Sequence, residues 1–293
     1  MPGLLGTRES FAKRFESPVE HAEGDSAARL QALVSPFVLR RVKEDVVADL
    51  PEKIEDTVMA QLTGEQRKLY LANQDRIAQQ VQHRESSEFK KDKLKVLAEL
   101  TKLRQICCDP RLHYEDYKAG SAKLDTCMEL VHGALDGGHR ILLFSQFTGM
   151  LDIIGKRLAK EDIAFLKLTG ASSKESRAKM VAQFQAGEVP VFLISLKAGG
   201  VGLNLTAADV VIHYDPWWNV AAQDQATDRA HRIGQQHTVT VYKLIAKDTI
   251  EERIMQMQES KRDLVNSVLG GDGISSALFT REDVLALLGG DGR

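Results

Sequence analysis

Two arginines, Arg229 and Arg232, stand three residues apart in the run DQATDRAHRIGQ. If this run is helical, both guanidinium groups lie on one face and can bind the same anion. Such a pair can stabilise charge that develops on a phosphate held by another domain, as arginine fingers do. The alternative is that both arginines form surface salt bridges with Asp224 and Asp228.

A glycine-rich loop, GGVG at residues 199–202, follows the apolar run 191–195. Because glycine adds no side chain, backbone amides of such a loop can approach a phosphate closely. A dinucleotide-binding fingerprint would need a third glycine where Leu205 stands, and a full crossover helix before the next strand. The loop therefore does not match that fingerprint.

No phosphate-binding P-loop of the form GxxxxGK[ST] occurs in the sequence. The nearest imitation combines Gly149 with Gly155 and Lys156, but its spacing is wrong and Arg157 replaces the serine or threonine. No acidic pair resembles a metal-holding DExH box. We therefore expect the chain by itself to bind ATP weakly, to hydrolyse it negligibly and to hold no metal.

The composition is that of a soluble globular protein, with 43% apolar and 27% charged residues and a net charge of -2. This charge argues against a uniformly basic nucleic-acid coat but does not identify a partner. The three cysteines have no metal-binding spacing and predict a reduced, intracellular protein. No apolar run of eighteen residues and no signal peptide occurs, which predicts no membrane contact.

From residue 120 onward, apolar runs of strand length alternate with helical patterns. This alternation predicts an α/β fold, a parallel sheet with helices on both faces. The strand order cannot be read from the pattern. The predicted strands are residues 140–145, 165–168, 191–195, 210–214 and 239–244, and the predicted helices are 122–135, 150–160 and 174–185, the last with a Ser172–Glu175 capping box.

Helices are also expected outside this region. A capping box of Thr63 and Gln66 begins one helix, and a second, with leucines sharing one face, ends at Asp109 and Pro110. We expect these two to form an antiparallel pair that projects from the main body. Thr249 and Glu252 cap a long helix over residues 249–269, and a short helix follows at 282–288.

Several motifs follow one another in a fixed order along nearly the whole chain. They are FVLRRVKEDVVADLPEK, LTKLRQICCDP, SAKL, ILLFSQFTGMLDII, LTGASSKESR, FLISLKAGGVGLNLTAADVVIHYDPWWN, DQATDRAHRIGQ and TIEERIMQMQESKRDLVNSVL. Together they resemble the C-terminal helicase lobe of the Swi/Snf-type ATPases, a branch of the superfamily-two helicases and translocases. The resemblance implies a RecA-like lobe at residues 120–248. It also implies an inter-lobe linker with short helices at 1–50, a helical insertion at 51–119, and a brace helix with a helical tail at 249–293.

The resemblance also implies roles for individual residues. Arg229 and Arg232 would be arginine fingers, and Gly202, Gln225 and Asp228 would lie at the ATP cleft. The residues that would face nucleic acid are Ser145, Gln146, Lys197, Gly199, Gly200, Asn204, Thr206 and Trp218. Contacts of this kind, mostly to phosphates, predict binding that depends on salt and carries little sequence information.

ATP and Mg²⁺ would be held mainly by a first lobe that this sequence does not contain. The implied partners are double-stranded DNA, that first lobe and a nucleoprotein complex. The isolated chain is expected to be inactive, and to reside in the cytoplasm of a bacterium or in the nucleus of a eukaryote. The alternatives are a non-catalytic lobe that binds DNA or protein, and a complete nucleotidase of another kind, for which the sequence shows no second phosphate site or general base.

Four positions depart from the pattern of the family. Ala122 stands where glycine is usual, Val220 replaces a proline, Gln223 replaces an acid, and Asp228 replaces the glycine of the general helicase motif. Asp228 is common in this branch. The changes at Val220 and Gln223 predict a different path for the loop that precedes the arginines, and none of the four changes an arginine.

Overall fold

The computed structural model describes residues 5–16, 29–30, 32–33, 35–37, 50–83, 86–199, 203–217, 220–258 and 281–289. The first of these segments holds a short helix, α1 (Arg8–Phe11), and a π-helical turn, η1 (Ala12–Glu16). A 3-10 turn, η2, covers Ser35–Phe37. No described helix is long and apolar enough to span a membrane.

Six parallel strands form one sheet in the order β1-β6-β5-β2-β4-β3. Every residue of the strands β2, β4 and β5 is buried, as expected of a parallel sheet covered on both faces. The predicted α/β fold, with a parallel sheet covered on both faces, is therefore confirmed. The bounds are β1 Lys53–Gln61, β2 Ile141–Ser145, β3 Phe165–Leu168, β4 Val191–Ser195, β5 Val210–His213 and β6 Val239–Lys247.

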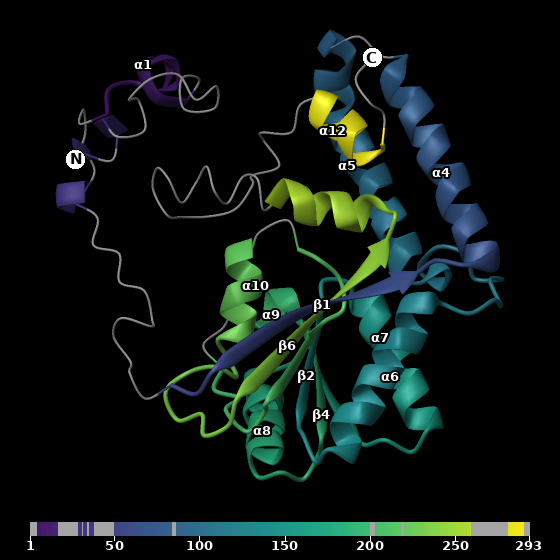
Figure 1. Cartoon of the computed structure of the whole chain (residues 1–293), viewed down its shortest axis with the longest axis vertical. Helices are drawn as coiled ribbons and strands as arrows, with labels where there is room; N and C mark the ends of the chain where they lie inside the picture. Colours follow the sequence, from purple (N-terminus) through teal and green to yellow (C-terminus); the bar gives the residue numbers. More distant parts are fainter. Residues whose placement is uncertain are drawn as a thin grey trace.

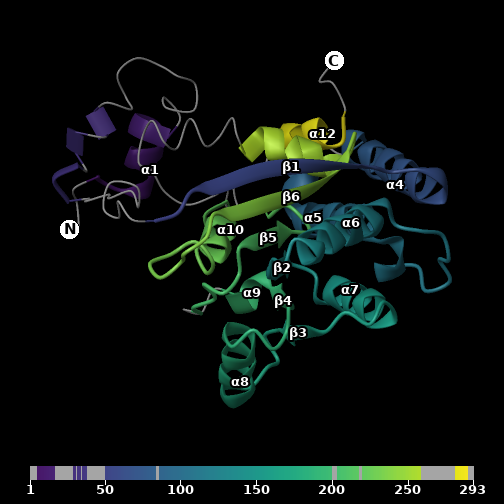
Figure 2. The same ribbon diagram turned by 60° about the horizontal axis from the view of Figure 1, so that its bottom comes forward.

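Helices cover both faces of this sheet (Figures 1 and 2). Ile141 and Leu143 of β2 pack in one apolar core with residues of α6 (Ala122–Asp136) and α7 (Thr148–Lys160). Leu142 and Phe144, which point the other way, pack in a second core with residues of α8 (Lys174–Gln185) and α10 (Val220–Thr227). The short helix α9 (Leu196–Gly199) follows β4 directly.

Two predicted capping boxes do not form. Helix α8 is capped by Ser173, whose hydroxyl accepts from Ser176 N, while Ser172 instead accepts from Thr169 N. Thr63 is the N-cap of α4 (Gly64–Gln82) but makes no side-chain cap hydrogen bond. The expected partner of Thr63, Gln66, bonds elsewhere: its Nε2 donates to Ile106 O at 2.9 Å and its Oε1 accepts from Ala122 N at 3.1 Å.

The predicted helical pair is present. Helix α4 packs beside α5 (Ser86–Cys108), followed by the 3-10 turn η4 (Pro110–Leu112). Helix α5 ends at the predicted place, directly before Asp109 and Pro110. A third apolar core joins this pair to the helical residues 250–258 and to α12 (Arg281–Leu287). The rest of the predicted helix 249–269 lies outside the described residues.

Strand β1, for which the sequence pattern predicts no strand, lies beside β6 at the edge of the sheet (Figure 1). Most of its residues are exposed, so its pattern carries no buried alternation. Glu55 of β1 accepts from Lys243 of β6 at 2.6 Å and pairs with Lys53 at 2.7 Å. Burial raises the pKa of Glu55, but the hydrogen bonds and charges of these two lysines outweigh burial and lower the pKa to about 2.

A buried ion pair joins α6 to the helical residues 250–258. Lys123 Nζ donates to Glu251 Oε2 at 2.8 Å and to Oε1 at 3.0 Å, and both side chains are fully buried. Glu251 also accepts from Ala246 N at 2.8 Å. Burial lowers the pKa of Lys123, but the charge of Glu251 outweighs burial, so the pKa is raised and the amine stays protonated.

Candidate functional site

The order of the strands places a switch of chain direction at β2. The chain leaves β2 through α7 on one face of the sheet, and it leaves the adjacent strand β4 through α9 on the opposite face. In open α/β sheets, ligands bind outside the carboxyl ends of the strands at such a point. The residues at that edge are Ser145 at the end of β2, Gln146 directly after it, Lys197 after β4, and Asp215 after β5.

Asp215 holds the ends of β2 and β5 together. It accepts from Ser145 Oγ at 2.5 Å and from Gln146 Nε2 at 2.6 Å. Gln146 Oε1 in turn accepts from Arg104 Nη1 at 3.2 Å. Ser145 is fully buried, and the Oε1 and Nε2 atoms of Gln146 already have partners. Ser145 and Gln146 were predicted to contact DNA. In this conformation they instead hold the ends of β2 and β5 together through Asp215.

A cavity of about 420 Å³ opens at the same edge. Hydroxyl groups and a tight turn line it, and these groups can donate hydrogen bonds to a phosphate. Its lining residues are Gln146, Thr148, Asp152, Lys167, Thr169, Gly170, Ala171 and Ser195.

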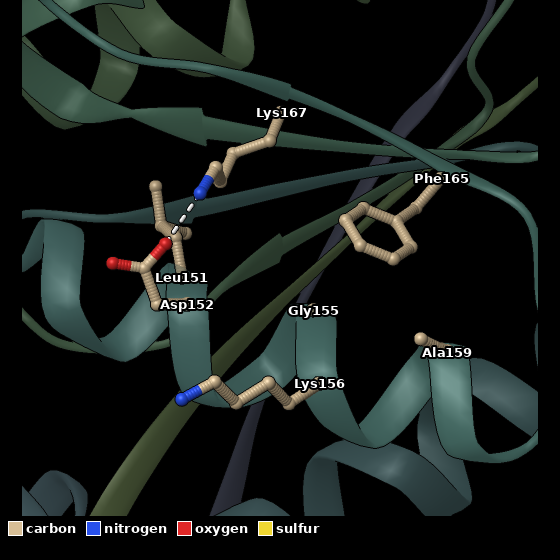
Figure 3. Close-up of a pocket in the computed structure, with 7 residues that line it drawn as sticks. All are labelled: Leu151, Asp152, Gly155, Lys156, Ala159, Phe165 and Lys167. Carbon is tan, nitrogen blue, oxygen red and sulfur yellow. Dashed lines mark hydrogen bonds and ion pairs between the residues drawn. The ribbon is translucent and has the colours of Figure 1, made fainter.

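Asp152 and Lys167 also line a second cavity of about 360 Å³, between α7 and β3 (Figure 3). Figure 3 shows Lys167 reaching from β3 to Asp152, with which it forms an ion pair. The ring of Phe165 lies over Gly155, where an added Cβ would lie 3.0 Å from that ring. Glycine at this position therefore lets α7 pack closely against β3.

The two candidate finger arginines do not lie on a regular helix, contrary to the sequence prediction. Helix α10 ends at Thr227, and turns follow it. Ala230 N and His231 N both donate to Thr227 O, at 3.0 and 3.1 Å. The segment 228–232 is therefore a structured turn, which we call the arginine turn.

The arginine turn is anchored to the loop before β5. Leu205 N donates to Arg229 O at 3.0 Å, and Arg232 Nη1 donates to Leu203 O at 3.5 Å. Arg229 is 9% exposed, whereas Arg232 is half-buried. Burial lowers the pKa of Arg229 and the positive charge of Arg232 lowers it further, although Asp228 opposes this. An anion between the two guanidiniums would relieve their repulsion.

The arginine turn also contacts the chain that leads into β1. His231 Nε2 donates to Pro51 O at 2.8 Å. Burial lowers the pKa of Lys53, but Glu55, with the charges of Asp224 and Asp228, outweighs burial and raises it. Because β1 is the edge strand, residues just before it and the arginine turn lie at one corner of the sheet.

The remaining predicted residues are dispersed. Asn204 is exposed beside the arginine turn, and Thr206 lines a polar cavity of about 350 Å³ with Arg140 at the amino ends of β2 and β5. This is the edge opposite Ser145, about 16 Å away for a five-residue strand. A DNA-binding surface that includes both Ser145 and Thr206 must therefore extend along the full length of the strands, from their carboxyl ends to their amino ends.

Other predicted residues can be placed only in part. Gln225 on α10 and Asp228 in the arginine turn are both exposed. Lys197 and Gly199 belong to α9 at the carboxyl edge, and only their place in this short helix is described. Gly200, Gly202 and Trp218 lie outside the described residues. Within the described part of the chain, no group of three or more His, Cys, Asp or Glu could hold a metal ion.

Comparison with known proteins assigns this arrangement to a family. Residues 122–234 match the helicase conserved C-terminal domain, and residues 1–112 match the SNF2-related domain. A solved Sulfolobus solfataricus SWI2/SNF2 ATPase C-terminal domain is 31% identical, with a TM-score of 0.65 over 80% of this chain and 98% of that one. The chain belongs to the Swi/Snf family of superfamily-two ATPases.

Two further relatives extend the likeness along this Swi/Snf chain. An ATP-dependent helicase of Mycoplasma pneumoniae is 39% identical over 98% of the chain, which spans 27% of that protein's length. The S. solfataricus SWI2/SNF2 ATPase core in complex with double-stranded DNA is 35% identical, with a TM-score of 0.67 over 98% of this chain and 61% of that one. The chain thus spans about a quarter of the length of the Mycoplasma helicase.

Four residues of this Swi/Snf lobe carry contacts that sequence reasoning missed: Arg104, Asp215, His231 and Gln258. Arg104 was detectable in principle, because it follows the buried Leu100 by one helical turn and so places a charge on an apolar face. The other three offer no such signal. Their partners are backbone or side-chain atoms from remote segments, which a local pattern does not reveal.

Acid should destabilise the Swi/Snf lobe through His213, which supports the helix before the arginine turn. Its Nε2 bonds Thr227 Oγ1 at 2.8 Å, and among the described residues its buried Nδ1 has no partner. Burial, then the charge of Lys243, lowers the pKa of His213 from 6.5 to about 3, while Glu55 opposes this. Between these values only the unfolded chain gains the proton, so stability falls as the pH is lowered, by about 1.4 kcal/mol for each pH unit.

Chemical unfolding followed from pH 7 to pH 4 checks this expectation. His213→Asn should have a flatter stability profile than the parent chain, whereas His237→Gln, at an exposed histidine, should keep the parent slope. Carboxylates such as Glu55 titrate alike in all three proteins, so the difference isolates His213. Equal slopes for the parent and His213→Asn would contradict the assignment.

Proposed function

We propose that this chain is the second motor lobe of an ATP-dependent translocase or remodeller of double-stranded DNA. Membership of the Swi/Snf family supports the reaction class. The observation that carries the proposal is the arginine turn, which holds two neighbouring arginines, Arg229 by its backbone carbonyl and Arg232 by its guanidinium, in a chain that has no phosphate-binding loop. A lobe that only binds a partner has no need of such a pair.

In this proposal, ATP and Mg²⁺ are held mainly by a first lobe that this sequence does not contain. Arg229 and Arg232 supply positive charge to the phosphates from the opposite side of the cleft, which stabilises charge in the transition state. Gly202, Gln225 and Asp228 line the same cleft. The contact of His231 with Pro51 supports this arrangement, because it ties the arginine turn to the segment that leads in from the linker.

The DNA contacts in this proposal come from the carboxyl edge of the sheet and from the loop before β5. Hydroxyl groups there, such as Thr148, Thr169 and Ser195, can donate to phosphates, and Lys197 can neutralise one. Closure and reopening of the two lobes would move these contacts along one strand of the duplex. The result is translocation without separation of the strands.

Reconstitution tests the proposal. The ATP-holding lobe of a Swi/Snf relative is supplied as a separate polypeptide or fused ahead of residue 1, and ATP hydrolysis is measured with and without duplex DNA. We expect negligible hydrolysis from either lobe alone and DNA-stimulated hydrolysis from the two together. Hydrolysis by this chain alone would indicate a complete nucleotidase. DNA binding without stimulation of the joined lobes would favour a non-catalytic binding lobe.

A further inference from the structure

The segment Pro216–Trp217 joins β5 to helix α10, and it is held by elements outside the sheet. Arg104 of α5 donates from Nη2 to Pro216 O. Gln258, in the helical segment 250–258, donates to Trp217 O. Two consecutive carbonyl groups are therefore fixed by the helical insertion and by the C-terminal helix. The next residue, Trp218, is a predicted DNA contact.

Arg104 is built into this position. It is only 1% exposed, its guanidinium lies 5.8 Å from the centre of the Phe147 ring, and a second donor, Nη1, reaches Gln146 Oε1 at 3.2 Å. One planar guanidinium thus holds the residue after β2 and the segment after β5. Lysine cannot replace this fork, because its ammonium is a single point charge.

The orientation of Gln146 follows from this contact. Its carbonyl oxygen faces the Arg104 guanidinium, and its amide nitrogen faces the Asp215 carboxylate at 2.6 Å. Only one orientation of the amide satisfies a cation at one end and an anion at the other. Asp215 also accepts from Ser145, so the network runs from α5 across the carboxyl ends of β2 and β5.

We infer that Arg104 is a positioning residue that couples the helical insertion to the DNA-contacting edge of the lobe. It holds Gln146 and the segment Pro216–Trp217, which we call the tryptophan segment, in place at the edge that the proposed function assigns to DNA. Movement of the α4–α5 pair against the sheet would therefore change DNA affinity without a direct contact between that pair and DNA. The inference rests on the proposed function in its assignment of this edge to DNA.

The chain carries a built-in probe, because its only two tryptophans are Trp217 and Trp218. Tryptophan fluorescence, excited at a wavelength that tyrosine does not absorb, therefore reports on these two neighbouring residues alone. In Arg104→Met we expect stronger acrylamide quenching and duplex DNA affinity lower by about tenfold, the loss expected for a charged hydrogen bond. In Arg104→Lys we expect an intermediate result. Gln258→Met should also increase quenching, and it serves if Arg104→Met fails to fold.

Arg76→Met is the matched control. Arg76 lies in the same helical pair, where it forms an ion pair with Glu99, and it has no contact with the tryptophan segment among the described residues. It should keep the parent quenching and the parent DNA affinity, measured by anisotropy of a labelled duplex at low salt. Parent-like quenching and affinity in Arg104→Met, or in Gln258→Met where Arg104→Met does not fold, would overturn the inference. If the parent chain itself does not bind duplex DNA, the DNA assignment fails first, and the inference fails with it.

Discussion

Replacement of Arg232 by alanine should lower DNA-stimulated ATP hydrolysis about a thousandfold in the two-lobe protein. Arg232 is the more exposed of the two arginines, and its truncation removes its charge and its 3.5 Å contact with Leu203 O, while the hydrogen bond from Leu205 N to Arg229 O still holds the turn. Because an arginine finger acts on charge that develops in the transition state, kcat should fall much more than ATP affinity.

The effect of Arg229→Ala should be comparable, with an added loss of stability because Arg229 is 9% exposed. Arg232→Lys should recover little activity, since an ammonium does not reproduce the planar guanidinium. Arg157→Ala is the matched control, because Arg157 lies on α7 in an ion pair with Glu161. Steady-state ATPase assays with saturating duplex DNA measure all four proteins. Retention of full activity by Arg232→Ala would rule out the finger assignment.

Removal of the amine from the buried Lys123–Glu251 pair should be the most destabilising substitution that we predict. Lys123→Met leaves the Glu251 carboxylate fully buried without its cation, and such a change costs about 3–5 kcal/mol. The pair also connects α6 to the helical residues 250–258, which pack in one apolar core with the insertion. Urea unfolding measures the loss.

Two further variants make this prediction specific. Lys123→Met combined with Glu251→Gln should recover part of the loss, because no unpaired charge remains and the amide oxygen can still accept from Ala246 N. Lys167→Met breaks the half-exposed pair with Asp152 and should cost no more than ~1 kcal/mol. Similar small losses in Lys123→Met and Lys167→Met would show that the buried pair contributes no more than a surface one.

Local patterns determined much of the fold. The apolar runs that became β2, β4 and β5 are buried at every position, so their composition specifies strands covered on both faces. The end of α5 follows from Asp109 and Pro110, because proline cannot continue a helix. Strand β1 was not predictable, because its exposed face carries no alternation and its place beside β6 is a contact between segments about 190 residues apart.

The capping of helices was also not predictable from local sequence alone. Gln66 has the spacing of a capping box, but it bonds to Ile106 O, Cys107 O and Ala122 N instead, since these buried backbone groups need partners. A local rule fails where a tertiary contact offers the side chain a more buried partner.

For the candidate site, the sequence by itself determined the residue types: two arginines three apart, a glycine-rich loop and no phosphate-binding loop. Only the tertiary structure decided that the arginines lie in a turn anchored to Leu203 and Leu205. It also decided that Ser145 and Gln146 bond to Asp215 and Arg104, and that Thr206 lies at the opposite edge of the sheet. The physical reason is that strand order and hydrogen-bond partners depend on remote segments, whereas periodicity and spacing record only neighbours along the chain.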